Sequence, residues 1–127
     1  MILLDTDVMI DILRGYQPAI EWLTSAADQE TGVPGLVVME VLQGCQNARE
    51  QKRVEKFLSG YPLYWGEPQD CDRALKTFST HYLSHNIGLL DALIAETVIG
   101  FGAELATFNV KHYGVLKELK TIQPYQR

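Results

Sequence analysis

The sequence has few cysteines, no long uninterrupted apolar run and fewer basic than acidic side chains. Its two cysteines, Cys45 and Cys71, are far apart and form no CxxC pair, and the first residues lack the basic-then-apolar layout of a signal peptide. The longest apolar stretch, residues 89–107, contains three acidic residues, which are costly in hydrocarbon. We therefore expect free thiols, a cytoplasmic location and no membrane span.

The balance of charge argues against a nucleic-acid partner. Eleven basic residues against 16 acidic ones give a formal charge of −5, whereas binding to phosphates is driven by cationic side chains. The objection weakens if several acidic residues converge on one cavity, where bound divalent cations would cancel them. Two local basic patches are present, although exposed helices often carry such clusters. They are Arg49, Lys52, Arg53 and Lys56, and Lys111, His112, Lys117 and Lys120.

The pattern of apolar residues predicts strands alternating with helices. With 127 residues and 46% hydrophobic content, residues 1–127 fit a single domain that buries roughly two-thirds of its unfolded surface. We expect strands at 2–4, 31–33, 61–65, 104–106 and 121–123. We expect helices at 8–13, 18–28, 36–43, 48–58, 68–83 and 89–101. Such alternation predicts an α/β layered domain with a mostly parallel sheet.

Polar residues directly after strands are the first candidates for function, because ligands of open α/β sheets bind beyond the carboxyl ends of the strands. Asp5 and Asn109 occupy such positions. Asp91 begins a helix, where the macrodipole favours negative charge. Taken singly, Asp5 and Asp91 are better explained as turn or cap residues than as ligands, and Asp7 is expected to cap the first helix.

Glu40 is harder to explain as a purely structural residue. It lies within the apolar segment Val37–Leu42, and a buried carboxylate without a partner costs several kcal/mol, on the order of 3–5. Its partner is either a lysine or arginine or a shared metal ion. If Asp5, Glu40 and Asp91 converge, their mutual repulsion calls for Mg²⁺ or Mn²⁺, which prefer oxygen ligands.

In order and spacing, several segments resemble the PIN-domain ribonucleases, and among them the VapC-like toxins of toxin–antitoxin pairs. The resemblance covers nearly the whole chain. It is carried by Met1–Asp11, by Glu40 in its apolar helix, by Leu90–Ala95 and by Leu105–Tyr113.

The resemblance implies a PIN-like three-layer α/β/α domain with a small, mostly parallel central sheet. It implies that Asp5, Glu40 and Asp91 hold the metal, with Thr6 and Thr107 in support. Asn109 completes the catalytic set, although many members carry an aspartate there, so that one charge is missing.

The activity that the resemblance implies is metal-dependent endoribonucleolytic hydrolysis of RNA, with Mg²⁺ or Mn²⁺ as cofactor and a metal-bound water as nucleophile. The chain is then the toxin of a toxin–antitoxin pair. Its expected partners are the RNA substrate, a cognate VapB-like antitoxin protein and a second copy in a homodimer. The helices near Tyr16 and Trp22 are candidate docking surfaces.

Other functions stay open at this point. Asp5 and Asp7 after an apolar strand also resemble the nucleophile motif of haloacid-dehalogenase-type phosphatases, but the paired acidic motif after a late strand is missing. Asn109 is compatible with an inactive PIN-fold RNA- or protein-binding module. His81 and His85 are spaced for one helical face but lack a third zinc ligand.

Overall fold

The computed structural model describes residues 1–127 and is built around a five-stranded sheet in which all paired strands are parallel. The strands follow the order β3-β2-β1-β4-β5. Their bounds are β1 Ile2–Leu4, β2 Thr31–Pro34, β3 Leu63–Tyr64, β4 Glu104–Ala106 and β5 Lys120–Ile122. The α/β class with a parallel sheet is therefore confirmed.

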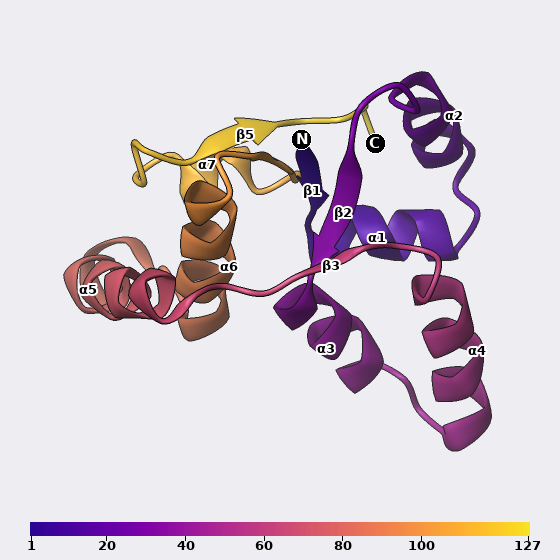
Figure 1. The fold of residues 1–127 in the computed structure, drawn as a ribbon, viewed down its shortest axis with the longest axis horizontal. Helices are drawn as coiled ribbons and strands as arrows, with labels where there is room; N and C mark the ends of the chain where they lie inside the picture. The colour runs from indigo at the N-terminus through magenta and orange to yellow at the C-terminus, as the bar shows by residue number, and fades with distance from the viewer.

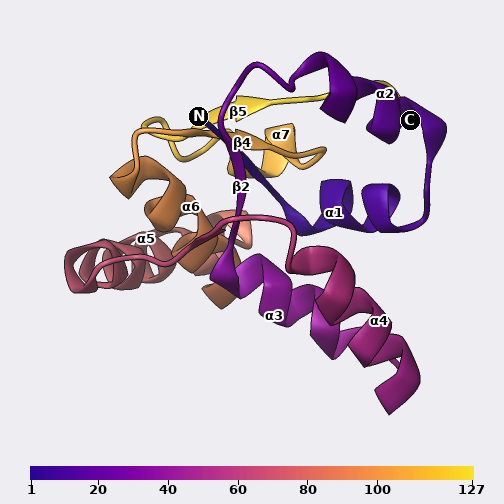
Figure 2. The same cartoon turned by 45° about the vertical axis from the view of Figure 1, so that its right-hand side comes forward.

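Helices cover both faces of this sheet. They are α1 Thr6–Leu13, α2 Gln17–Ser25, α3 Gly35–Gln43, α4 Ala48–Leu58, α5 Pro68–His85, α6 Leu89–Gly100 and α7 Val110–Tyr113. Figures 1 and 2 show α1 and α2 on one side of the sheet and α5 and α6 on the other. The strand order explains this division. The chain moves from β1 outward to β3 and then returns past β1 to β4, and right-handed crossovers in opposite directions place their helices on opposite faces.

The core lies along the central strands. Leu3, Leu4, Leu105 and Ala106 have no exposed surface and belong to a cluster of 21 buried residues. Because helices cover both faces, the central strands are continuously apolar instead of alternating, which is why short runs such as Ile2–Leu4 predicted them correctly.

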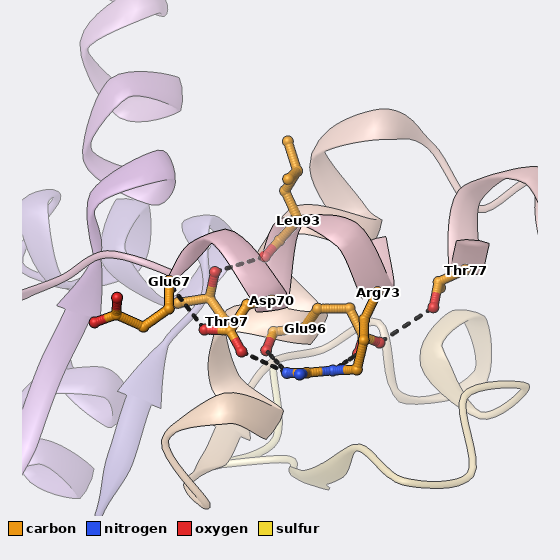
Figure 3. Close-up of polar contacts among 7 residues, drawn as sticks. All are labelled: Glu67, Asp70, Arg73, Thr77, Leu93, Glu96 and Thr97. Atoms are coloured by element: carbon orange, nitrogen blue, oxygen red, sulfur yellow. Dashed lines mark hydrogen bonds and ion pairs between the residues drawn. The ribbon is translucent and has the colours of Figure 1, made fainter. Parts of the chain in front are cut away.

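Helices α5 and α6 pack along each other and are joined by a buried polar network (Figure 3). Arg73 on α5 donates to Asp70 at 2.5 Å and to the Glu96 carboxylate on α6 at 3.1 Å. Thr77 donates to the second oxygen of Glu96 at 3.2 Å. The network supplies partners to the two carboxylates buried between the helices.

None of the helices combines the length and the apolar character that a membrane span needs.

The start of α1 corrects one prediction. Asp5, not Asp7, is the N-cap residue, and its carboxylate accepts a hydrogen bond from the Thr6 N–H at 2.8 Å. The helix therefore begins two residues earlier than the apolar spacing from Val8 indicated. The short helix α7 was not predicted, since four residues give too little periodicity to recognise.

Candidate active site

The candidate site lies at the carboxyl ends of β1 and β4. These strands are neighbours in the sheet but far apart in the chain, at the point where the strand order reverses, and ligands of open α/β folds bind at such points. A pocket of about 220 Å³ opens there. Its lining contains four carboxylates and no lysine or arginine: Asp5, Thr6, Asp7, Ile10, Glu40, Asp91, Ile94, Asn109 and Tyr113. All four predicted catalytic residues thus border one pocket.

Asp5 follows β1 directly and is the most buried of the four carboxylates, with 5% of its surface exposed. The Thr107 hydroxyl, at the end of β4, donates to Asp5 Oδ2 at 2.8 Å, so the predicted supporting residue contacts it directly. Burial, together with the charges of Asp7 and Glu40, raises the pKa of Asp5 to about 6, although the hydrogen bonds from Thr107 and Thr6 act in the opposite direction. The ionised form of Asp5 therefore lacks compensating positive charge.

Glu40 reaches the pocket from the middle of α3. The Thr6 hydroxyl donates a hydrogen bond to Glu40 Oε1, which gives Thr6 a visible supporting contact. The expectation that Glu40 is fully buried was wrong: it is half-buried, and its neighbour Met39 is 58% exposed. Neither a lysine nor an arginine pairs with it. Glu40 thus belongs to the acidic pocket instead of a structural ion pair.

Asp7 was predicted mainly as a helix cap, but it connects two segments of the site. Its Oδ1 accepts from the Val8 N–H at 2.8 Å, and its Oδ2 accepts from the Phe108 N–H at 2.9 Å, just after β4. Both oxygens are engaged by backbone groups. Asp7 therefore fixes the loop after β4 against α1 while adding negative charge to the pocket.

Asp91 lies in the first turn of α6, as predicted. Its Oδ2 accepts from the Gly88 N–H at 2.8 Å and lies 3.0 Å from His112 Nε2. His112 entered the sequence analysis only as part of a basic patch. Its place three residues after Asn109, inside the segment that carries the family resemblance, was the one available signal of a role near the site.

The last side of the pocket comes from α7. Asn109 is the exposed N-cap residue of α7, and its backbone N–H donates to the Thr107 hydroxyl at 3.0 Å. Tyr113 is buried, which raises the pKa of its phenol, and the charges of all four pocket carboxylates raise it further. One hydroxyl thus responds to four acidic groups from three separate helices and the end of β1.

The pocket suits a hydrated divalent cation. Carboxylate and amide oxygens are the donors that Mg²⁺ and Mn²⁺ prefer, and a cation would offset the unbalanced charge around Asp5. No three His, Cys, Asp or Glu side chains form a closed set that could hold an ion. Because Mg²⁺ keeps several waters, carboxylates can hold it either directly or through those waters, and an open pocket of this kind still fits it. His81 and His85 lie ring to ring at 5.6 Å but have no third ligand.

Comparison with known proteins agrees with this architecture. The family model of the PIN domain matches residues 2–116. Ribonuclease VapC10 of Mycobacterium tuberculosis is 35% identical over 122 residues, covering 94% of this chain and 91% of the relative. Ribonuclease VapC19 of the same organism is 31% identical over 125 residues, covering 94% and 98%. A toxin–antitoxin complex from Klebsiella pneumoniae contains a chain with a TM-score of 0.80 at 23% identity, with all of both chains covered.

The fold and the acidic pocket define a protein of the PIN class. The chain belongs to the PIN-domain family, with VapC ribonucleases among its relatives. The phosphatase alternative loses its support, because the family model spans most of the chain and both oxygens of Asp7 are held by backbone N–H groups.

Proposed function

We propose that this protein is a metal-dependent endoribonuclease that acts as the toxin of a toxin–antitoxin pair. The observation that carries the proposal is the pocket at the reversal of strand order, which is lined by four carboxylates and by no lysine or arginine. The relatives named ribonuclease at 31–35% identity support the reaction class.

Asp5, Glu40 and Asp91 are the residues that would hold Mg²⁺ or Mn²⁺, with the Asn109 amide oxygen beside them. A bound divalent cation supplies Lewis acidity at phosphoryl oxygens and lowers the pKa of water. The contribution of the chain itself is to position the acidic side chains. Thr107 and the Thr6 N–H hold Asp5, and the Thr6 hydroxyl holds Glu40, so that the acidic oxygens keep fixed places around the pocket.

A protein antitoxin is the proposed regulator. The Klebsiella neighbour is a toxin–antitoxin complex, which supports a partner of this kind. A groove of about 440 Å³ between α1, α3 and α4 offers a docking place, since it joins an apolar floor to the cations Arg14 and Arg53. The surface near Tyr16 and Trp22 is less suitable, because both rings pack against Tyr125.

A homodimer and a cytoplasmic location complete the proposal. An apolar cleft on α5 and α6 supports the dimer, because its rim residues Leu75 and Leu89 are 68% and 62% exposed. The two cysteines are unpaired, which is compatible with a reducing compartment.

The second candidate is an inactive PIN-fold binding module. Asn109 adds no charge to the site, and the carboxylates do not form a closed ligand set. The unbalanced charge around Asp5 favours the active enzyme, because a site without a metal gains nothing from that cost.

The proposed activity is tested by incubating purified protein with total bacterial RNA and mapping new 5′ ends by sequencing. We expect discrete cleavage sites with Mn²⁺ or Mg²⁺, none in EDTA, and none with Asp5→Ala or Asp91→Ala. Asp72→Asn, an exposed acid on α5, is the matched control and should cleave as wild type. Cleavage that persists in EDTA contradicts the metal mechanism, and no cleavage with any metal favours the binding module.

The antitoxin proposal is tested by coexpressing the chain with the small protein encoded beside it. We expect the two to copurify and toxicity to disappear. Phe57→Glu in the groove should abolish copurification, whereas Phe101→Glu should not, although the two phenylalanines are equally exposed at 41% and 40%. Unchanged toxicity on coexpression contradicts the toxin assignment.

A further inference from the structure

We infer that His112 is a positioning residue that holds the Asp91 carboxylate in the orientation required for metal binding. The inference rests on the proposed function, because it assigns a task to a residue beside the proposed metal site. His112 does not line the pocket itself. It acts on the metal only through Asp91.

The contact joins two distant segments. His112 Nε2 lies 3.0 Å from Asp91 Oδ2, 21 residues away in the chain. A carboxylate oxygen only accepts, so the contact requires the proton of the imidazole to reside on Nε2. The Gly88 N–H donates to the same oxygen at 2.8 Å. Two donors therefore engage Oδ2, and no hydrogen bond engages Oδ1, which is left free for a ligand.

Packing alone does not fix Asp91, because its side chain is 31% exposed. The Gly88 N–H, at the N-cap of α6, supplies one hydrogen bond, and one bond alone leaves the carboxylate free to rotate. The hydrogen bond from the His112 imidazole reaches Asp91 from another direction and restricts this rotation. Hydrogen-bond partners behind metal-binding side chains commonly change metal affinity by roughly 10- to 100-fold.

The segment that carries His112 is itself anchored to the site. Along Thr107–His112, the Thr107 hydroxyl donates to Asp5, the Phe108 N–H donates to Asp7, and His112 contacts Asp91. One short stretch after β4 thus supplies a partner to three of the four pocket carboxylates. This arrangement is what a positioning element requires, and an isolated surface ion pair would not show it.

The test measures Mn²⁺ affinity of metal-free protein by isothermal titration calorimetry. We expect His112→Ala to weaken binding about 10- to 100-fold. His112→Gln, which keeps an N–H donor of similar reach, should stay within about threefold of wild type by the same reasoning. His85→Ala, an exposed histidine at the end of α5, is the matched control and should not change affinity. Thermal unfolding of each variant verifies that it is folded.

Wild-type affinity in His112→Ala, or equal losses in the Ala and Gln variants, overturns the inference. Asp91→Asn provides the reference for a lost ligand. If wild type binds Mn²⁺ and Asp91→Asn does not, the proposed site stands, and the His112 variants decide the inference alone.

The contact has a second readout that needs no metal. In ¹⁵N-labelled, metal-free protein above pH 8, NMR should show His112 almost entirely as the Nε2–H tautomer, and Asp91→Ala, which removes the acceptor, should return the ring to the tautomer mixture of a free imidazole. A proton on Nδ1 overturns the inference. If wild type binds no Mn²⁺, the proposed function fails, and an intact Nε2–H contact would then leave His112 only a role in docking α7, which overturns the positioning role as well.

Discussion

Two groups of carboxylates in this molecule differ in whether an arginine pairs with them, although helix α6 contributes to both groups. Asp70 and Glu96, each 5% exposed, share Arg73, and Thr77 and the Glu67 N–H supply further donors (Figure 3). The four carboxylates of the pocket have backbone and hydroxyl donors but no lysine or arginine.

The difference separates a structural role from a functional one. The Arg73 cluster supplies its own cation and needs no outside group, as buried ionised groups in a stable fold require. The pocket around Asp5 contains no lysine or arginine, and burial, with the charges of Asp7 and Glu40, raises the pKa of Asp5 to about 6. The lack of a lysine or arginine among the pocket carboxylates therefore supports the proposed metal site more strongly than burial or acidity alone.

The largest contrast is expected when the same substitution is made in each cluster. Glu40→Gln should lower RNA cleavage at least about 100-fold, because it removes a metal-holding charge worth several kcal/mol. Glu96→Gln should leave cleavage per folded molecule unchanged but lower the free energy of unfolding by about 2 kcal/mol, as it weakens hydrogen bonds to a charged partner. Single-turnover cleavage and urea unfolding measure the two effects. Equal losses of cleavage activity in both variants would contradict the assignment of a functional role to Glu40 and a structural role to Glu96.

Asp5 predicts how the stability of metal-free protein depends on pH. Its pKa is about 6 in the folded chain and 3.8 when the carboxyl is unperturbed, as in the unfolded chain, so the folded form holds a proton that the unfolded form has lost between these values. The free energy of unfolding should therefore fall as pH rises from about 4 to above 6, by roughly 3 kcal/mol from this group.

Asp5→Asn lacks this ionisation, so the stability of the variant relative to wild type should rise by that amount across the same window. Urea unfolding in EDTA at several pH values measures it. If the free energy of unfolding has the same pH dependence in wild type and variant, the Asp5 charge is already balanced without metal.

Removing the cation of the structural cluster should destabilise the fold. Arg73→Ala leaves two buried carboxylates without their partner, and such losses reach about 3–5 kcal/mol. Because the Arg73 side chain is 41% exposed, water screens part of this loss, and we expect a smaller but clear fall in the free energy of unfolding. Arg49→Ala on the exposed face of α4 should stay within about 0.5 kcal/mol. Chemical unfolding without metal measures both, and a neutral Arg73→Ala would contradict the structural assignment.

The smallest expected effect concerns a single hydroxyl. Thr107→Val keeps the side-chain shape but removes the donor to Asp5, and one hydrogen bond to a charged group contributes about 1.5–3 kcal/mol. Since the Thr6 N–H still engages Asp5, we expect the low end of this range in unfolding at pH 7. At pH 4, where Asp5 is largely protonated, the same substitution should lower the free energy of unfolding by less than at pH 7. An equal loss at both pH values would mean that the hydroxyl does not act on the carboxylate charge.

Sequence patterns predicted the parts of the structure that depend on local order. The apolar run Ile2–Leu4 ends in a polar residue, so the position of Asp5 at a strand end followed from the chain itself, whereas Asn109 lies three residues beyond β4, at the N-cap of α7. The bounds of α4 were predicted correctly because its apolar and charged residues alternate with a clear helical period.

The remaining features depend on tertiary contacts. Met39 faces solvent beside Glu40, and a run of apolar neighbours does not reveal which helix face is covered. The roles of Asp7 and His112 arise from contacts that span 101 and 21 residues, to Phe108 and Asp91. The presence of a cation in one cluster and not in the other likewise depends on the packing of α5 against α6, which brings Arg73 to Glu96.

The most direct test of the account is a Mg²⁺ or Mn²⁺ titration of wild type and Asp91→Asn, following thermal stability and RNA cleavage in the same samples. We predict that wild type alone gains stability and cleaves RNA, over one range of metal concentration, because the ion fills the pocket between Asp5, Glu40 and Asp91. If neither protein responds to metal, these carboxylates are separate structural residues, and the ribonuclease proposal is contradicted.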